Sequence, residues 1–406
     1  MVFSAHELFD FSGSGLLKSK QIILTFVGYY LPGYKAGGPL RTIDNMVAHL
    51  SEDFEFWVVT RDRDLSETKP YSSIQTNVWQ QVGQAKVFYC SPDKCSVSGL
   101  AEIINQTPHD VLYLNSFFDP VFTLKPLVAR FFRKIKSENI VLAPRGEFSA
   151  GALKIKRQKK RLYIAAAKVV GLYSKVLWQA SSNHEADDIK REFLIDHENI
   201  FVAMDLPAPL NKVLQKGDCN EWMAPDVLKV IFLSRISPKK NLNYALNILS
   251  KIKAQVVFDI YGPIEDQSHW DICKDIIDKT PTNIQINYCG AVEPDNIAAT
   301  FDCYDLFLFP TLGENYGHVI AEALTVGTPV LISDRTPWRN LQEDRIGWDL
   351  PLDSEGEFIK TIEVYSSMPV EQRLSWRKHI RSKIVERLVN EDVVNDNRQL
   401  FQSVLG

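Results

Sequence analysis

The sequence lacks several features that would assign the protein to a class at once. It has no excess of positive charge, because its 406 residues carry 46 lysines and arginines against 50 aspartates and glutamates, for a formal net charge of −4. Proteins that track nucleic-acid phosphates carry excess cations, so this balance argues against a nucleic-acid partner. The six cysteines form no CxxC pair and no zinc-ligand spacing, which fits small buried side chains in a reducing compartment.

Long apolar runs and a secretory leader are also missing. Residues 1–20 contain no basic segment followed by an apolar stretch, so they do not resemble a signal peptide. No uncharged apolar run approaches the ~20 residues that span a bilayer. The nearest one, from Leu162 to Trp178, is interrupted by Lys168 and Lys175. We therefore expect a cytoplasmic protein, and peripheral contact with the inner face of the cytoplasmic membrane stays open.

Short apolar runs alternate with longer helical stretches along the whole chain. Continuous β-branched or aromatic runs that are separated by helices predict parallel sheets covered on both faces. The runs occupy residues 21–28, 54–61, 86–90, 110–117, 139–144, 175–181 and 200–204 in a first series and 228–234, 255–261, 284–289, 306–310 and 329–333 in a second.

Two series of strands imply two domains. The break falls in a polar, proline-bearing segment at residues 208–224, which we predict to be a linker. The sequence predicts an α/β protein with two doubly wound, Rossmann-like domains at residues 1–207 and 225–380. A helical segment at residues 381–406 follows and can pack back on the first domain. Because ligands of open α/β sheets bind beyond the carboxyl ends of the strands, we expect the chemistry in a cleft between the domains.

The most informative segment follows the fourth predicted strand of the second series and reads Gly-Glu-Asn-Tyr-Gly-His. Glu314 and Glu322 lie eight residues apart, which is about 800° of rotation and roughly 80° out of register on one helix. We therefore place Glu314 in a loop and Glu322 one turn inside a helix. The N–H groups of Gly317 and His318 would then form an anion site at the helix start. Alternatively, the carboxylates only complement the helix dipole.

This segment resembles the E-x7-E motif of the family 4 retaining glycosyltransferases, which have the GT-B fold of two domains facing across a cleft. The Ala-Glu-Ala step around Glu322 and the Gly-Thr-Pro-Val-Leu start of the next strand agree with the motif. The resemblance implies that Glu314 binds hydroxyls of a donor sugar and Glu322 the ribose. It places the residues between them in the same donor site, namely Asn315, Tyr316, Gly317 and His318. The first domain would bind the acceptor and the second the nucleotide sugar.

A second loop carries cations after the predicted strand at residues 228–234. Arg235 and Lys240 follow the strand end, where cations can clamp a diphosphate. The resemblance implies that both act on the donor phosphates in catalysis, with Lys239 as a bystander. A solvated basic turn is the alternative interpretation.

Three glycines and an arginine complete the predicted site. Paired glycines such as Gly37 and Gly38 let a backbone approach a ligand, although a tight turn would use them too. The resemblance places them opposite the donor phosphates, and it places Gly262 beside the nucleobase of the donor. Many members of the family have His where Arg145 stands. Arginine cannot act as a base near neutral pH, but it can bind an acceptor phosphate or polarise a leaving group. A salt-bridged structural arginine is the alternative to this catalytic role.

The resemblance predicts a retaining glycosyltransferase of the bacterial polysaccharide or lipid-linked glycan type. It would move a sugar from a nucleotide diphosphate sugar to a hydroxyl of a glycan or polyprenyl-linked acceptor, without a cofactor or metal. Asp62-Arg63-Asp64 mimics a D-x-D metal motif, but we interpret it as a turn. The basic stretch from Lys154 to Arg161 is either a solvated face or a contact with an anionic membrane. The rival functions are a nucleotide-sugar 2-epimerase and a non-catalytic sugar-nucleotide-binding subunit.

Overall fold

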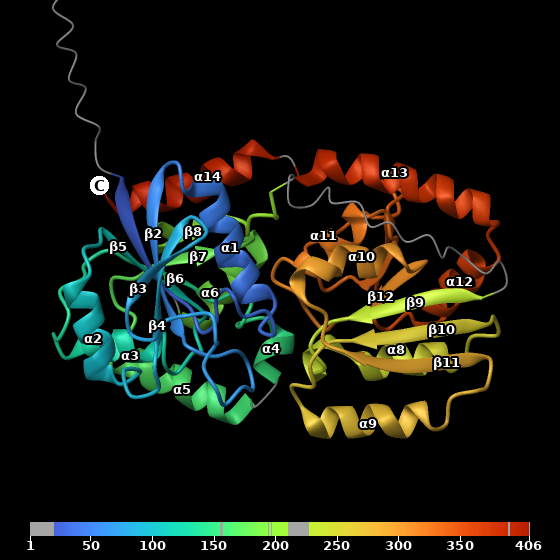
Figure 1. Cartoon of the computed structure of the whole chain (residues 1–406), viewed down its shortest axis with the longest axis horizontal. Helices are drawn as coiled ribbons and strands as arrows, with labels where there is room; N and C mark the ends of the chain where they lie inside the picture. Colours follow the sequence, from blue (N-terminus) through green and yellow to red (C-terminus); the bar gives the residue numbers. More distant parts are fainter. Residues whose placement is uncertain are drawn as a thin grey trace, which may run out of the picture.

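The computed structural model describes residues 20–154, 157–193, 195, 197–209, 227–388 and 390–405. Residues 1–19, most of the predicted linker and part of the basic stretch, including Lys156, lie outside the described residues. Within the described residues the chain forms two α/β domains that lie side by side (Figure 1).

The first domain is built on an eight-stranded sheet in the order β3-β4-β2-β1-β5-β6-β7-β8. Neighbouring strands are parallel, except that β3 and β4 are antiparallel. The strands are β1 (Gln21–Phe26), β2 (Phe54–Arg61), β3 (Trp79–Val82), β4 (Ala85–Cys90), β5 (Val111–Asn115), β6 (Ile140–Ala143), β7 (Leu177–Ala180) and β8 (Ile200–Val202). The helices of this domain are α1 (Gly38–Leu50), α2 (Val97–Gln106), α3 (Leu124–Phe131), α4 (Ala150–Lys154), α5 (Arg157–Val169) and α6 (Asn183–Phe193).

The second domain is built on a six-stranded parallel sheet in the order β11-β10-β9-β12-β13-β14. Its strands are β9 (Leu228–Leu233), β10 (Val256–Tyr261), β11 (Ile284–Gly290), β12 (Leu306–Phe309), β13 (Val330–Ser333) and β14 (Gly347–Leu350). Its helices are α8 (Leu242–Leu249), α9 (Gln267–Ile277), α10 (Ile297–Asp302), α11 (His318–Thr325), α12 (Glu355–Ser366) and α13 (Val370–Leu388).

The predicted fold class is confirmed, because each apolar run of the sequence lies on a strand of one of these two sheets. Central strands such as β5, β6 and β12 are buried at every position, which is why they appear as unbroken apolar runs. Two edge strands escaped prediction. β3 contains two glutamines and β14 contains an aspartate, so neither forms an apolar run.

The C-terminal helices connect the two domains along one edge of the molecule (Figure 1). Helix α13 packs on the second domain, where Arg377 donates to the Asp302 carboxylate at 2.8 Å. The predicted boundary at residue 380 therefore falls inside a helix. Helix α14 (Glu391–Ser403) crosses to the first domain, and Asn397 donates to the carbonyl of Met204 at 2.8 Å. Among the residues that the structure describes, none of the helices has the length and apolarity that crossing a membrane requires.

Aromatic packing holds α14 on the first sheet. The ring of Phe401 is fully buried and lies 5.4 Å from Phe54, 6.2 Å from Phe56 and 5.6 Å from Tyr113, measured between ring centroids. The first domain thus completes its core with a residue from the end of the chain.

We expect Phe401→Ala to lower the free energy of unfolding of the first domain by about 3–5 kcal/mol, because it removes a buried ring and leaves a cavity. Urea unfolding followed by tryptophan fluorescence measures the change. The control Phe131→Ala truncates an exposed ring of the same domain and should have little effect. Equal effects of the two substitutions would contradict the packing role of α14.

Candidate functional site

A cleft of about 560 Å³ lies between the two domains, at the carboxyl ends of both sheets. Loops that follow β1, β5, β6 and β8 line one wall, and loops that follow β9, β10, β11 and β12 line the other. Every candidate residue predicted from the sequence lines this cleft, namely Gly37, Gly38, Arg145, Arg235, Lys240, Gly262, Glu314, Asn315, Tyr316, Gly317, His318 and Glu322. Their roles stay predictions.

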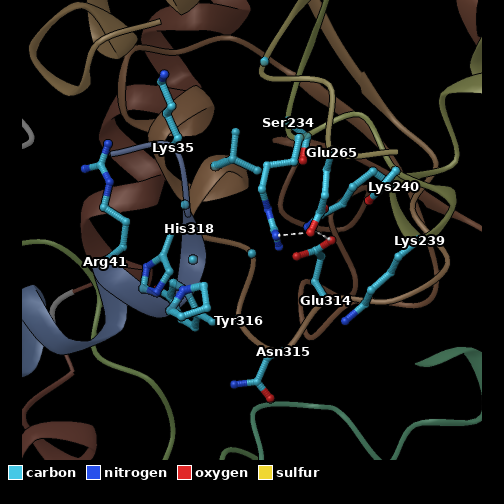
Figure 2. Close-up of a pocket in the computed structure, with 18 of the residues that line it drawn as sticks. Lys35, Arg41, Ser234, Lys239, Lys240, Glu265, Glu314, Asn315, Tyr316 and His318 are labelled. Atoms are coloured by element: carbon cyan, nitrogen blue, oxygen red, sulfur yellow. Dashed lines mark hydrogen bonds and ion pairs between the residues drawn. The ribbon is translucent and has the colours of Figure 1, made fainter. Parts of the chain in front are cut away.

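Glu314 and Lys240 form a largely buried ion pair on the second-domain wall (Figure 2). The Lys240 ammonium lies 2.7 Å from Glu314 Oε1, and the Thr311 hydroxyl donates to the same oxygen at 2.9 Å. Burial alone would raise the pKa of the Glu314 carboxyl, but the ammonium groups of Lys240 and Lys239 outweigh it and hold that pKa below its usual range. Glu314 is therefore a carboxylate that accepts hydrogen bonds, and it lies in the loop where the sequence placed it.

Two further cations of the same loop line the cleft. Arg235 donates to Glu265 at 2.9 Å, and both side chains are partly exposed. Lys239 also lines the cleft, and within the described part of the chain its ammonium has no hydrogen-bond or ion-pair partner. The position of Lys239 speaks against the bystander role that the sequence suggested, because an unpaired cation in a cleft is available to an anionic ligand.

Glu322 lies inside α11, as predicted from its register, and pairs across the cleft with the first domain. Its carboxylate is 3.1 Å from the Arg41 guanidinium of α1. Burial raises the pKa of the Glu322 carboxyl, and the charge of Arg41 opposes that shift. A ligand hydroxyl could donate to Glu322 only where Arg41 leaves an oxygen of the carboxylate open.

His318, the first residue of α11, is held by the first domain and is uncharged. Its Nε2 lies 3.0 Å from the Thr42 hydroxyl. Burial lowers the pKa of the His318 imidazole to about 4, although the charge of Asp205 opposes the shift. The ring therefore supplies no positive charge near neutral pH, and the attraction of this helix start for anions rests on its backbone N–H groups and dipole.

Asp205, just after β8, is the junction between the two walls. Its carboxylate pairs with the Arg145 guanidinium and accepts from the Thr42 hydroxyl at 3.3 Å. The side-chain amide of Asn315, from the second domain, donates to the same carboxylate at 2.8 Å. Asn315 also accepts from the Ser181 hydroxyl at 2.7 Å, so its predicted donor-binding amide serves as an interdomain contact here.

Arg145 is buried, and each of its three guanidinium nitrogens donates a hydrogen bond. Besides Asp205, its guanidinium donates to Asn115 Oδ1 at 2.7 Å and to the Tyr113 hydroxyl. This arrangement is the salt-bridged structural arginine that the sequence left as an alternative. Because Asp205 neutralises its charge, the geometry favours this structural role over the catalytic role predicted for Arg145.

The glycines line the cleft for different reasons. A Cβ atom at Gly262, where φ is +133°, would lie 1.9 Å from the carbonyl oxygen of Ser234, so two strand ends can touch only if this residue is glycine. Gly37 and Gly38 open α1 on the opposite wall, and a Cβ atom on either would meet nothing within 4 Å. Their backbone therefore borders open space in the cleft, as a phosphate-facing loop requires.

The predicted turn at Asp62-Arg63-Asp64 braces the first-domain wall and lies outside the cleft lining. Asp62 accepts from the Arg63 guanidinium at 2.7 Å. Asp64 accepts from the backbone N–H groups of Tyr34 and Lys35 at 2.9 and 3.2 Å. Within the described residues, no group of three or more metal-ligating side chains occurs that could hold a metal ion.

Comparison with known proteins agrees with this geometry. Residues 223–383 match the family model described as glycosyl transferases group 1. The sucrose-phosphate synthase of Thermosynechococcus elongatus superposes with a TM-score of 0.68 at 16% identity, over 95% of this chain and 99% of that chain. Anabaena HepE, in complex with UDP and glucose, superposes with a TM-score of 0.66 at 15% identity, over 95% and 99% of the two chains.

The fold is GT-B. A relative from Klebsiella pneumoniae, described as an uncharacterized 41.2 kDa protein in cps region, is 22% identical over 377 residues. The match covers 88% of this chain and 99% of the relative. The group 1 match and the fold together support a glycosyltransferase.

The sequence did not reveal several residues of this GT-B cleft. Arg41, Asp205 and Lys160 line it, and Lys160 donates to the carbonyl of Ala152 at 2.8 Å. Lys160 belongs to the basic stretch predicted to face solvent or a membrane, but it turns inward, whereas Arg157 and its exposed neighbours do not. Arg41 lies three residues after the paired glycines, on the first turn of α1. This spacing was the signal in the sequence that could have marked Arg41 as a cleft residue.

We expect Asp205→Asn to lower the free energy of unfolding by about 3–5 kcal/mol, because it leaves the Arg145 charge buried without a counter-ion. Chemical denaturation measures the change. As a control, Glu55→Gln breaks the exposed pair with Lys86 and should cost at most about 1 kcal/mol. An Asp205→Asn protein as stable as the control would argue against the junction.

We expect the unfolding free energy to fall by about 3 kcal/mol through His318 as the pH drops from 6.5 towards 4. The unfolded chain binds a proton on this imidazole near pH 6.5 and the folded chain only near about 4, so acid favours unfolding. His318→Gln should remove this part of the pH dependence, measured as the difference from wild type. His184→Gln, at an exposed site, should leave the wild-type profile unchanged.

Proposed function

We propose that the protein is a retaining glycosyltransferase of family 4, which transfers a sugar from a nucleotide diphosphate sugar to a hydroxyl group of an acceptor glycan. The observation that carries the proposal is the grouping of Lys240, Glu314, Arg235 and Lys239 beside the start of α11, in a cleft between two Rossmann-like domains. Such a grouping offers cations and backbone N–H groups to phosphates and a carboxylate to sugar hydroxyls.

The donor diphosphate fits between the cationic loop after β9 and the N-terminus of α11. Lys239 is unpaired among the described residues, Arg235 is held only by a partly exposed pair, and the N–H groups of Gly317 and His318 open the helix. Glu314, kept ionised by Lys240, can then accept from hydroxyls of the sugar, and Glu322 from the ribose. The charges thus match a ligand that is anionic in its middle and rich in hydroxyls at both ends.

In the proposed reaction the acceptor oxygen attacks the anomeric carbon from the side of the departing diphosphate. The bond between that carbon and the phosphate oxygen breaks with its electron pair, and the acceptor proton passes to the leaving phosphate. The chain contributes orientation and stabilisation of the charge that develops on the leaving group. The proposal includes no cofactor or metal ion, because Arg235, Lys239, Lys240 and the α11 dipole carry positive charge to the diphosphate.

The similar proteins support the class of donor and the setting. Anabaena HepE was solved with UDP and glucose, which are the parts of a nucleotide sugar. The Klebsiella pneumoniae relative is described as a protein in cps region, which supports a place in the synthesis of a cell-surface polysaccharide. We therefore propose a glycan or polyprenyl-linked glycan as the acceptor, bound on the first-domain wall.

We expect Lys240→Ala and Glu322→Ala each to lower the rate of sugar transfer by about 100-fold or more, because each removes a group that binds the donor or stabilises its leaving phosphate. Transfer from radiolabelled donors measures the rate. Lys360→Ala and Glu357→Ala, at exposed sites of the same domain, are matched controls with wild-type rates expected.

The donor is found first by a thermal-shift screen of UDP and GDP sugars, since a bound donor stabilises the folded state by mass action. Near-wild-type transfer by Lys240→Ala would overturn the assignment of the cationic loop. Interconversion of donors in the absence of any acceptor would point instead to a nucleotide-sugar epimerase, and tight donor binding without transfer to a broad acceptor panel would point to a sugar-nucleotide-binding subunit.

A further inference from the structure

Helix α5 turns an apolar stripe to solvent. The stripe consists of Leu162, Ala165, Ala166 and Val169, which share one helix face by their spacing and are all exposed. Leu162 and Val169 are 74% and 88% exposed. A different face of the helix packs on the domain through Ile164 and Ala167. Surface helices normally present polar side chains to water, so this second apolar face requires an explanation.

The C-terminal end of α3 adds exposed aromatic side chains on the same side of the domain. Phe131 and Phe132 are both exposed, and their rings lie 5.3 Å apart between centroids. Arg130 donates to the carbonyl of Ser174, in the turn after α5, at 2.9 Å. The two helices run along the lower edge of the first domain (Figure 1). We call the stripe and these two rings the α3–α5 surface.

The two segments that form the α3–α5 surface carry charge of one sign. Residues 148–184, which include α5, contain no aspartate or glutamate, and neither do residues 120–137, which include α3. The exposed cations of these segments are Arg157, Lys159, Arg161, Lys168, Lys175, Arg133, Lys134 and Lys136. This one-sided charge occurs in a chain whose formal net charge is −4, so it is a local feature of this face.

We infer that the α3–α5 surface docks on a membrane leaflet that contains anionic lipid. Exposed apolar side chains flanked by cations fit the boundary between headgroups and acyl chains, where the apolar groups insert and the cations meet lipid phosphates. A second copy of the chain would bring like charges together, which disfavours self-association through this face.

Docking in this way would bring the cleft close to the membrane. Lys160, on the first turn of α5, lines the cleft, whereas Arg157 and Arg161 on the same turn face solvent. Helix α5 thus borders both the first-domain wall of the cleft and the α3–α5 surface. The inference stands apart from the proposed reaction, because vesicle binding is measured without donor or acceptor.

Flotation of the full chain with vesicles tests the inference. We expect wild-type protein to float with vesicles of phosphatidylcholine and phosphatidylglycerol and not with phosphatidylcholine alone. The apolar variant Leu162→Glu with Val169→Glu should lower the partition coefficient by about tenfold or more, because the stripe no longer inserts. The charge variant Arg157→Glu, Lys159→Glu and Arg161→Glu should lower it by a factor on the order of 100, at about fivefold for each cation.

The matched control places the same apolar-to-acidic change elsewhere. Ile272→Glu with Val364→Glu replaces two exposed side chains of the second domain and should bind vesicles as wild type does. Thermal unfolding establishes that each variant is folded. Absence of wild-type binding to the anionic vesicles would overturn the inference, as would unchanged binding of the apolar variant. Stripe-dependent association with a soluble acidic protein, without vesicle binding, would also overturn it.

Discussion

The buried carboxylate of Asp205 is the constraint on which the cleft depends. It carries a charge away from water, which is tolerated only because Arg145 neutralises it and neutral donors satisfy its remaining lone pairs. Those donors come from both sides of the cleft, since Thr42 belongs to α1 and Asn315 to the loop before α11. One carboxylate therefore joins the segment after β8, helix α1 and the loop before α11, and it fixes how the two walls face each other.

Several other charged side chains of the cleft are also paired with opposite charges. Its second-domain wall pairs Lys240 with Glu314 and Arg235 with Glu265, and Glu322 reaches across to Arg41. In the donor-free protein these pairs hold the long side chains in place. An anionic donor bound as proposed would enter by exchange of partners, with its phosphates competing with Glu265 for Arg235 and meeting the Lys239 ammonium directly. Partly exposed pairs are weak, which makes the exchange at Arg235 feasible.

The sequence predicted the fold, and that its candidate residues would share one cleft, for one physical reason. Parallel strands buried on both faces must be continuous apolar runs, and the residues that follow them must meet at one edge of each sheet. The sequence could not predict which side chains form hydrogen bonds and ion pairs with one another, because these contacts depend on how distant segments pack. Arg145 appeared as a charge near the reacting centre, but its neighbours Asn115 and Asp205 lie 30 and 60 residues away along the chain. The predicted boundary at residue 380 lies inside α13, because the helical pattern has no break there.

The carboxylates that line the cleft also bear on how a proton could leave the acceptor. Each of those in the described residues already has a partner. Four form ion pairs, namely Asp205 with Arg145, Glu265 with Arg235, Glu314 with Lys240 and Glu322 with Arg41. The other two accept from backbone N–H groups, Glu147 from Phe117 and Phe118 and Asp266 from His269 at the start of α9. His318 is neutral but bonded to Thr42, and arginine is no base near neutral pH. In the donor-free protein the described lining thus offers no carboxylate without a partner, and the proposed reaction needs none, because in it the leaving phosphate takes the proton.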